Sequence, residues 1–410
     1  MKPRKSAKTA RRRKTSKRKS KTMKYDFSAI KNHSLERIAE KKLAGCGSMI
    51  KIGGETVWED CTGWSSIEKN EPIRPDSIYR LASMSKPVTG VAVMQLVEQN
   101  KLGLFDDVRK YFPELTGFGV AGRDENGKII KVADARREMT VFDMLTHTSG
   151  LAQADLGFIQ LGEKVFAPYM RPGITLSEMI PLFSKLLLDC HPGEAMGYGA
   201  EAPFDTLGGI VEKVSDMPFE EYLRKNIFDP LGMNDTTFHL TPEQRSRRVS
   251  IYEADGENVK LMFPDCEDNM IGVPESLEAG SCGLAGTVGD YMKFAEMLLG
   301  KGEYRGVRIL KRATVEFMST PLNRPETAGY NIGQVWGISM RVVNTPDPNA
   351  MPPFGTFGWS GAYGTHFIVC PFENLAAVYC SNLTNAGGSG AATAFEFERD
   401  IFDALKAAAK

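Results

Sequence analysis

The chain contains 410 residues, of which 42% are hydrophobic and 25% are charged, a composition that excludes a fibrous or disordered protein. It has no apolar run of the roughly 18 residues that a membrane-spanning helix needs, and its N-terminus lacks the apolar stretch of a secretory signal. We therefore expect a globular protein with no membrane span and a cytoplasmic location.

The first 24 residues form a strongly basic segment. They contain 13 Lys or Arg and no acidic residue, which leaves 38 basic against 51 acidic residues in 25–410. Such a segment buries little apolar surface, so we predict a disordered arm over residues 1–24. The arm either docks to nucleic acid or another anionic surface, or is a dispensable extension, and Met23 offers an alternative start of translation. The acidic remainder makes nucleic acid a poor main substrate.

After the arm, the sequence predicts a helix, a hairpin, a strand and a buried helix. In chain order these elements are expected at residues 34–45, 47–64, 77–83 and 88–97. The hairpin turns at Gly53-Gly54, because runs with β-branched and aromatic residues flank this glycine pair. The last helix is apolar at nearly every position, so we expect it to be buried on most sides.

The middle of the chain favours helices, and the C-terminal part favours strands again. Helical segments broken by Pro or Gly are expected at 139–151, 175–189, 202–216 and 218–233. Two further helices, three short apolar strands and a closing helix are expected at 287–300, 311–320, 333–343, 364–371, 374–382 and 391–409. This order predicts a sheet domain built from residues 25–104 and 286–410, with an inserted helical domain over 105–285.

The seven cysteines are scattered and odd in number, at positions 46, 61, 190, 266, 282, 370 and 380. No pair has C-x-x-C spacing, and no histidine cluster lies near them as a zinc site requires. We expect free structural thiols, and we predict no metal and no cofactor.

A serine followed three residues later by a lysine occurs five times, beginning at Ser16, Ser28, Ser48, Ser66 and Ser83. The first four lie in or beside the arm, or in strand and turn segments where the two side chains point to different faces. Ser83 opens the buried helix, on which Lys86 lies on the same side one turn later. Serine needs a neighbour to remove its proton, and lysine does this when burial favours its neutral form. The pair is either a nucleophile with its base, or a helix cap followed by a lysine that reaches solvent.

Several blocks carry a family resemblance: "SMSK" at 83–86, "MLTHTSGL" at 144–151, and longer blocks at 218–238 and 280–310. Together they resemble the serine β-lactamase and penicillin-binding-protein superfamily, in particular its class C-related branch, and are closest in motif to family VIII carboxylesterases. The resemblance covers most of residues 25–405. It implies a β-lactamase-like α/β (α+β) fold, with an antiparallel sheet flanked by helices and an inserted, mostly helical domain.

The resemblance implies roles for three side chains. Ser83 would be the acylated nucleophile, and Lys86 would be its proton partner. Tyr198, just ahead of a predicted helix, would relay a proton between Ser83 and the leaving group. Ala200 stands where penicillin-recognising members have an asparagine that grips the substrate amide, so that donor is missing.

The triplet Trp359-Ser360-Gly361 replaces the Lys-Thr-Gly triplet of the resembling families. The resemblance makes these three residues substrate-binding, and tryptophan would offer an apolar wall where lysine would attract a carboxylate. The backbone N–H groups of Ser83 and Ala362 would form the oxyanion hole. Esterase members of the family carry such Trp-x-Gly triplets.

The histidine at position 147 raises the alternative of a Ser-His-Asp triad. We expect a structural role instead, because no Gly-x-Ser-x-Gly elbow is present and the block around His147 is structural in the resembling families. The prediction is therefore a serine hydrolase that acts on a small-molecule ester or amide and cleaves small esters through an acyl-enzyme on Ser83. D-peptidase, penicillin-binding or weak β-lactamase activity of the same serine is the first alternative. A non-catalytic binding protein docked by its basic arm is the second.

Overall fold

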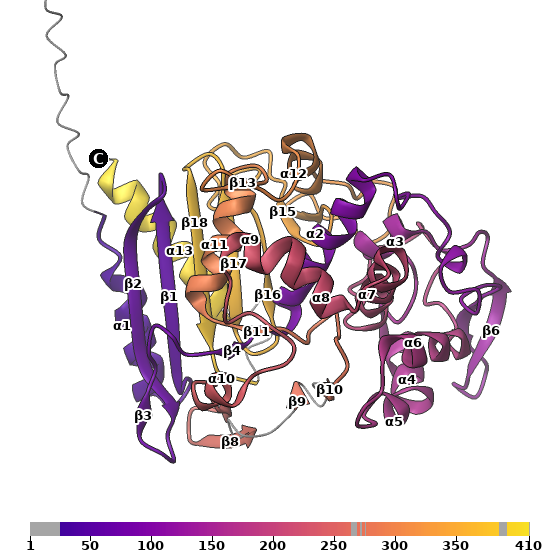
Figure 1. The fold of residues 1–410 in the computed structure, drawn as a ribbon, viewed down its shortest axis with the longest axis horizontal. Helices are drawn as coiled ribbons and strands as arrows, with labels where there is room; N and C mark the ends of the chain where they lie inside the picture. The colour runs from indigo at the N-terminus through magenta and orange to yellow at the C-terminus, as the bar shows by residue number, and fades with distance from the viewer. Residues whose placement is uncertain (1–24, 264–268, 271–272, 275, 385–391, 410) are drawn as a thin grey trace, which may run out of the picture.

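An eight-stranded antiparallel sheet forms the left half of the molecule in the view of Figure 1. The computed structural model describes residues 25–263, 269–270, 273–274, 276–384 and 392–409. The strand order in the sheet is β14-β15-β16-β17-β18-β1-β2-β3. The strands are β1 Gly45–Ile52, β2 Glu55–Ser66, β3 Glu71–Pro72, β14 Gln334–Trp336, β15 Arg341–Val343, β16 Phe357–Gly361, β17 Thr365–Cys370 and β18 Leu375–Ser381.

The sheet joins the N-terminal and C-terminal parts of the described chain. Strand β1 pairs with β18, and Ile50 lies opposite Ala377. The hairpin predicted at Gly53-Gly54 is confirmed, since both glycines have a positive φ, +61° and +84°, that suits a tight turn. The sheet and its flanking helices confirm the predicted α/β fold class.

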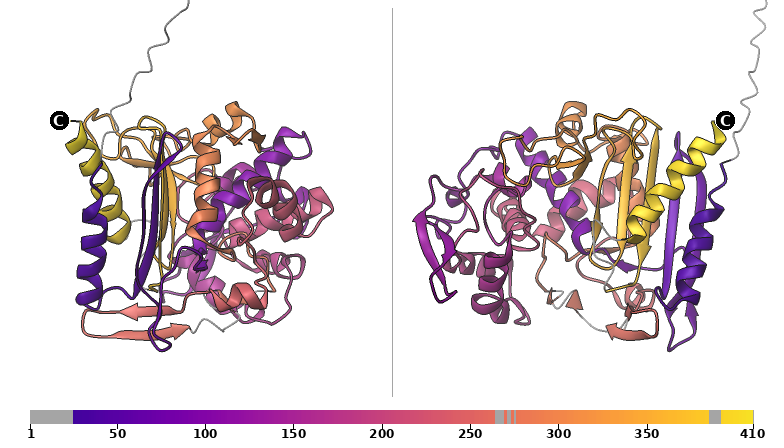
Figure 2. Two further views of the ribbon diagram at one scale, coloured as in Figure 1. Left: turned by 60° about the vertical axis from the view of Figure 1, so that its left-hand side comes forward. Right: turned by 180° about the vertical axis from the view of Figure 1, so that it is seen from behind.

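Helices cover both faces of the sheet (Figure 2). Helices α1 (Ser28–Ala39) and α13 (Ala392–Ala408) lie together on one face, and α11 (Val288–Leu299) lies on the other. Apolar side chains such as Phe27 and Phe397 fill the layer between the α1–α13 pair and the sheet. The predicted closing helix is confirmed by α13, whereas the first helix begins six residues earlier than predicted. Ser34 lies inside this helix, where its hydroxyl donates to the carbonyl oxygen of Ile30.

The remaining helices lie mostly between residues 141 and 246. They are α3 Val141–Leu145, α4 Asp155–Lys164, α5 Phe166–Tyr169, α6 Leu176–Met179, α7 Ala202–Ser215, α8 Phe219–Leu223, α9 Asp229–Leu231 and α10 Pro242–Ser246, with α12 Arg312–Met318 further on. Short 3₁₀ helices occupy Val108–Lys110 and Ile180–Lys185, and a π-helical turn occupies Arg224–Phe228. Helices α4 and α5 were not predicted, and the proposed division into domains stays a prediction.

Short two-stranded sheets accompany these helices. They are β5 Gly119–Arg123 with β6 Ile129–Asp134, β7 Ile251–Ala254 with β8 Val259–Phe263, β9 Asn269–Met270 with β10 Val273–Pro274, and β12 Glu303–Tyr304 with β13 Val307–Arg308. The region predicted as a helical insertion thus also contains hairpins.

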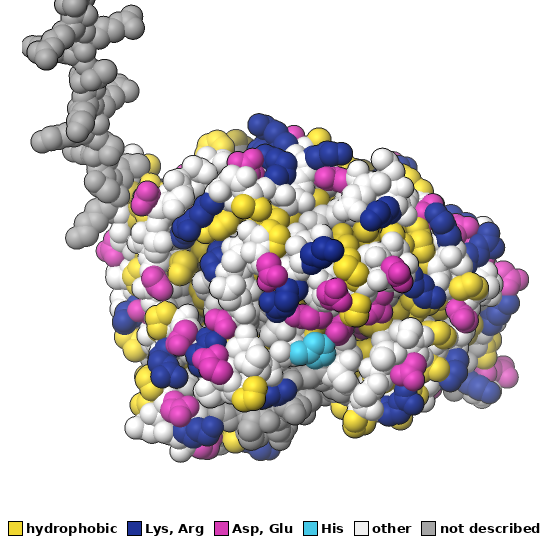
Figure 3. Space-filling model, in the orientation of Figure 1, with side chains coloured by type: hydrophobic (Ala, Val, Ile, Leu, Met, Phe, Trp, Pro, Cys, Tyr) yellow, Lys and Arg dark blue, Asp and Glu magenta, His cyan; other side chains and the backbone are white. Residues whose placement is uncertain are grey.

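The surface mixes charges of both signs. On the face seen in Figure 3, Lys and Arg side chains are interspersed with Asp and Glu side chains. Among the described residues, every helix is too short or too polar to span a membrane. The basic arm of residues 1–24 lies outside the described part of the chain, so the prediction of its disorder stays a prediction.

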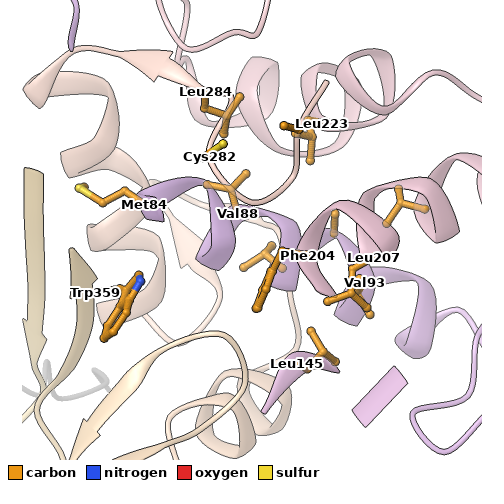
Figure 4. Close-up of a cluster of buried hydrophobic side chains, with 14 of the residues drawn as sticks. Met84, Val88, Val93, Leu145, Phe204, Leu207, Leu223, Cys282, Leu284 and Trp359 are labelled. Carbon is orange, nitrogen blue, oxygen red and sulfur yellow. The ribbon is translucent and has the colours of Figure 1, made fainter. Parts of the chain in front are cut away.

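The most buried helix is α2 (Ser85–Glu98), in which residues 85–96 are all buried, as predicted. Val88 and Val93 of α2 lie close to Phe204 and Leu207 of α7 in the large apolar core (Figure 4). The segment before α2 differs from the prediction. Only β4 (Tyr79–Arg80) is extended there, paired with β11 (Ala285–Gly286), and residues 82–84 form a 3₁₀ turn.

Candidate functional site

Ser83 and Lys86 lie in direct contact where the 3₁₀ turn runs into α2. The Lys86 Nζ donates to Ser83 Oγ at 3.1 Å and to the carbonyl oxygen of Ser281 at 3.0 Å. Lys86 is fully buried, whereas Ser83 is half-buried. Within the described residues, no carboxylate forms an ion pair with Lys86. The Ser83 hydroxyl thus faces a buried amine whose other hydrogen-bond partner is a backbone carbonyl oxygen.

The turn that carries Ser83 has an unusual backbone. Ala82, directly before Ser83, has φ +49°, a left-handed conformation that residues other than glycine rarely adopt. Conformations of this kind cost roughly 1–3 kcal/mol and persist only where the surroundings enforce them. Ala82 is completely buried, so the surrounding core enforces it here.

The end of β16 packs against this turn. A methyl group added to Gly361 would lie 2.3 Å from the carbonyl oxygen of Leu81, so only glycine allows this approach. The Thr365 hydroxyl donates to the same Leu81 carbonyl at 2.9 Å. The backbone that follows Gly361, at Ala362, is therefore brought up to the turn that holds Ser83.

Tyr198 lies beside the same pair, in the loop before α7. The Lys86 Nζ is 5.0 Å from the centre of the Tyr198 ring. The indole Nε1–H of Trp359 donates to the Tyr198 hydroxyl oxygen at 3.2 Å. The structure thus brings together Ser83, Lys86, Tyr198 and Trp359. Ala200, two residues beyond Tyr198, has no side-chain hydrogen-bond donor.

Aromatic rings form one wall of this group. The ring of Trp336, on β14, stacks on Tyr198 with centroids 6.0 Å apart and meets the ring of Trp359 at 4.4 Å. His147 lies behind both, 4.7 Å from Tyr198 and 4.5 Å from Trp336. Trp336 was missed at the sequence level, because nothing distinguishes it from any apolar residue in a short strand.

Ser281, whose carbonyl oxygen accepts the hydrogen bond from Lys86, is itself held by a buried carboxylate. The Asp205 Oδ1 accepts the backbone N–H of Ser281 at 3.0 Å, and its Oδ2 accepts the Tyr169 hydroxyl at 2.6 Å. Burial raises the pKa of Asp205 above its usual range, although these bonds and the charge of Lys86 act against that shift. Ser281 contributes its backbone, so the identity of its side chain could not have revealed this role.

Ser360 does not join the group. Neighbouring residues of a strand point to opposite faces, and the Ser360 side chain points away from Trp359 toward α13. Its hydroxyl lies 2.7 Å from Nδ1 of His366, whose Nε2 lies 3.0 Å from a carboxylate oxygen of Glu398. Arg341 also donates to Glu398. Ser360 could therefore contact a substrate only through its backbone, although the family resemblance implied a substrate-binding role for it.

This buried chain of polar groups supports the strand that carries Trp359. Arg341, His366 and Glu398 are each at most 5% exposed. Burial alone would raise the pKa of Glu398, but Arg341 and His366 together lower it below its usual value. The carboxylate is thus held charged between two partners behind β16.

Glu398→Gln is expected to lower the free energy of unfolding by about 3–5 kcal/mol, because it leaves the buried Arg341 without a counter-charge. Urea unfolding followed by circular dichroism measures the change. Glu396→Gln, two residues away on α13, is the control. Its partner Arg37 and Glu396 itself are each 22% exposed, so we expect a loss of no more than about 1 kcal/mol. Equal losses in the two variants would contradict the role given to Glu398.

Neither a metal nor a disulfide takes part in this arrangement within the described ranges. No group of three or more His, Cys, Asp or Glu side chains there could hold a metal ion. Six of the seven cysteines are described, and all six are free thiols, while Cys266 lies outside the described residues. Burial raises the pKa of Cys282, close to the site, to about 12, so this thiol stays protonated.

Comparison with known protein families identifies the family of this chain. The family model described as Beta-lactamase matches residues 32–397, which is most of the chain. The chain belongs to the beta-lactamase family. This confirms the resemblance inferred from the sequence motifs.

Two curated relatives and one solved structure show how far the family likeness extends. Protein Rv1367c of Mycobacterium tuberculosis is 33% identical over 355 residues, covering 82% of this chain and 85% of that protein. Esterase EstB of Burkholderia gladioli is 25% identical over 390 residues, covering 87% and 91%. The structure of EstCE1, described as a hydrolase with promiscuous acyltransferase activity, matches with a TM-score of 0.74 at 22% identity, covering 92% and 98%. The family likeness therefore extends over nearly the whole fold.

Proposed function

We propose that this protein is a serine hydrolase that cleaves small esters through an acyl-enzyme on Ser83. The observation that carries the proposal is the 3.1 Å contact between Ser83 Oγ and the Nζ of Lys86, a fully buried amine. Membership of the beta-lactamase family and the similarity to esterase EstB support it.

In the acylation step, Ser83 Oγ attacks the ester carbonyl carbon and its proton passes to the neutral Nζ of Lys86. The negative charge on the carbonyl oxygen is taken up by the backbone N–H groups of Ser83 and Ala362, and such donors are worth about 3 kcal/mol each. When the tetrahedral intermediate collapses, the carbon–oxygen bond to the alcohol breaks. The alcohol oxygen takes the proton of the Tyr198 hydroxyl, and Lys86 returns its extra proton to Tyr198.

Deacylation runs the same proton path in reverse. A water molecule attacks the acyl carbon, its proton passes to the Tyr198 and Lys86 pair, and Ser83 Oγ recovers a proton as it leaves. The Trp359 indole N–H donates to the Tyr198 oxygen, which leaves the phenolic hydrogen free to point at Ser83 or the leaving group. An alcohol that replaced the water would turn hydrolysis into acyl transfer.

The substrate class follows from the side chains around Ser83. Trp336 and Trp359 offer an apolar wall, which suits an acyl or alkyl group rather than a carboxylate. Ala200 has no side-chain group that could hydrogen-bond to a substrate amide. Both features favour esters over β-lactams and peptides.

The experiment that tests the proposal is labelling with a serine-reactive fluorophosphonate, followed by intact-mass analysis and peptide mapping. We expect one adduct per chain on Ser83 and none in Ser83→Ala. Turnover of p-nitrophenyl acetate and butyrate is measured in parallel. The proposal is rejected if wild type and Ser83→Ala hydrolyse these esters equally.

Nitrocefin and penicillin test the amide alternative in the same two proteins. Rapid nitrocefin hydrolysis or stable acylation of Ser83 by penicillin would favour D-peptidase or β-lactamase chemistry. The cytoplasmic location and the docking role of residues 1–24 stay predictions.

The pH dependence of the activity should reflect the ionisation of Glu201, which directly precedes α7. Burial raises the pKa of its carboxyl group to about 7, while the charge of Lys86 acts in the opposite direction. The carboxylate that forms above about pH 7 places a negative charge near Lys86, where it opposes the negative charge that develops on the ester oxygen during acylation. Glu201→Gln is therefore expected to raise kcat/KM several-fold above about pH 8 and to leave it unchanged below about pH 6.

A pH profile of kcat/KM from pH 5 to 9 checks this prediction. Glu212→Gln is the matched control, because burial likewise raises the pKa of Glu212 to about 7, but its carboxylate accepts the backbone N–H of Phe219 rather than facing Lys86. Identical profiles for wild type and Glu201→Gln would contradict it.

A further inference from the structure

His147 lies directly behind Tyr198 and is completely buried. It follows α3 and has φ +56°, a left-handed backbone that a residue with a side chain rarely adopts. The nucleophile, its base and the oxyanion donors described above do not include it. A strained, buried polar residue at this place calls for an explanation from its contacts.

His147 accepts hydrogen bonds from the backbone N–H groups of the two residues that flank Tyr198. The N–H of Gly197 donates to the His147 carbonyl oxygen at 3.0 Å. The N–H of Gly199 donates to Nδ1 of the His147 ring at 3.1 Å. One residue therefore fixes the backbone both before and after Tyr198, while its ring packs 4.7 Å from the Tyr198 ring.

The ring must be neutral to do this. Because Nδ1 accepts a hydrogen bond, the ring hydrogen is on Nε2, which has no partner among the described residues. Burial, and then the charge of Lys86, hold the pKa of His147 well below its usual value. Protonation would place a hydrogen on Nδ1 and break the bond from Gly199. The Nδ1 atom, which would accept a proton, hydrogen-bonds to Gly199 rather than to Ser83, so His147 does not act as the base of a triad.

We propose that His147 is a positioning residue that sets the Tyr198 hydroxyl against Ser83 and Lys86, acting through Gly197 and Gly199 rather than by proton transfer. The inference rests on the proposed function. A proton relay depends on geometry, and a displacement of about 1 Å costs as much as 100-fold in rate. Removing the acceptor at Nδ1 frees the peptide group that follows Tyr198.

Three substitutions test the role of the acceptor. Asparagine at 147 places an amide oxygen near the position of Nδ1, glutamine places its amide further out, and leucine removes every polar atom. We expect His147→Leu and His147→Gln to lower kcat for an alkyl ester by about 10- to 100-fold, with KM changed less than about threefold. His147→Asn is expected to recover most of the activity. Thermal unfolding of each variant shows whether it is folded. If the leucine variant does not fold, the comparison is made between the asparagine and glutamine variants alone.

A double-mutant cycle with Tyr198→Phe separates positioning from general structural damage. If His147 acts through the Tyr198 hydroxyl, His147→Gln causes no further loss of kcat in the Tyr198→Phe background. An equal fold-loss in both backgrounds would overturn the inference, as would full activity of His147→Gln alone. Wild-type enzyme with no turnover of any ester would instead overturn the proposed function, and this inference with it.

Discussion

A Lys86→Met variant is expected to acylate Ser83 about 1,000-fold more slowly than wild type, within the roughly 10²–10⁴-fold range that a general base contributes. Methionine has a similar length and is apolar, so it fits the buried position without introducing a charge. It removes the only group within the described chain that hydrogen-bonds to Ser83 Oγ. The rate of fluorophosphonate labelling, measured at pH 8, checks the prediction.

Lys213→Met is the matched control for this measurement. Lys213 lies on the exposed side of α7, where its Nζ sits 4.1 Å from the ring centre of Phe112, away from Ser83. Its labelling rate should equal that of wild type. Labelling of Lys86→Met within about tenfold of wild type would show that another group takes the Ser83 proton.

The contact between Ser83 and Lys86 could be predicted from sequence because it is local. Residues three apart on a helix lie on one face, whatever the rest of the fold does. The buried helix α2 could likewise be read from its continuous apolar run. Tyr198 was different, because its place beside Lys86 depends on how a distant loop packs. Only the family resemblance pointed to it.

The errors at the site have physical causes. Residues 77–83 were predicted as one strand, but only Tyr79–Arg80 form a strand, because burial of a turn gives a composition similar to burial of a strand. The left-handed Ala82 could not be foreseen, since alanine has no preference for that conformation. The alternation of side chains along a strand could have corrected the assignment of Ser360. Adjacent strand residues face opposite sides, so Trp359 and Ser360 could not both present their side chains to a substrate.

Two supporting groups lie beyond sequence reasoning for a different reason. Ser281 acts through its carbonyl oxygen, which every residue has. Glu398 acts from the last helix and meets His366, 32 residues earlier in the chain on β17, only because α13 packs against the sheet. Such roles follow from the three-dimensional packing and carry no local motif.

Tyr198→Phe is expected to lower kcat/KM, which reports acylation, by about 10²–10³-fold for an alkyl ester such as ethyl butyrate, and by less than about tenfold for p-nitrophenyl butyrate. The two substrates share an acyl group and differ in the leaving group. An alkoxide must be protonated as it departs, which is the task proposed for the Tyr198 hydroxyl. The p-nitrophenolate ion leaves without a proton, so the loss of the phenol matters little to it.

The ratio of the two kcat/KM values therefore isolates the proton donor from general damage to the site. Misfolding or a displaced Ser83 would lower both rates equally, because acylation uses the same serine. Phenylalanine keeps the ring against Trp336 and removes only the oxygen that accepts from Trp359. Tyr304→Phe, on the distant hairpin strand β12, should change neither rate. Equal losses on both esters would assign proton donation to Lys86 alone and leave Tyr198 as part of the aromatic wall.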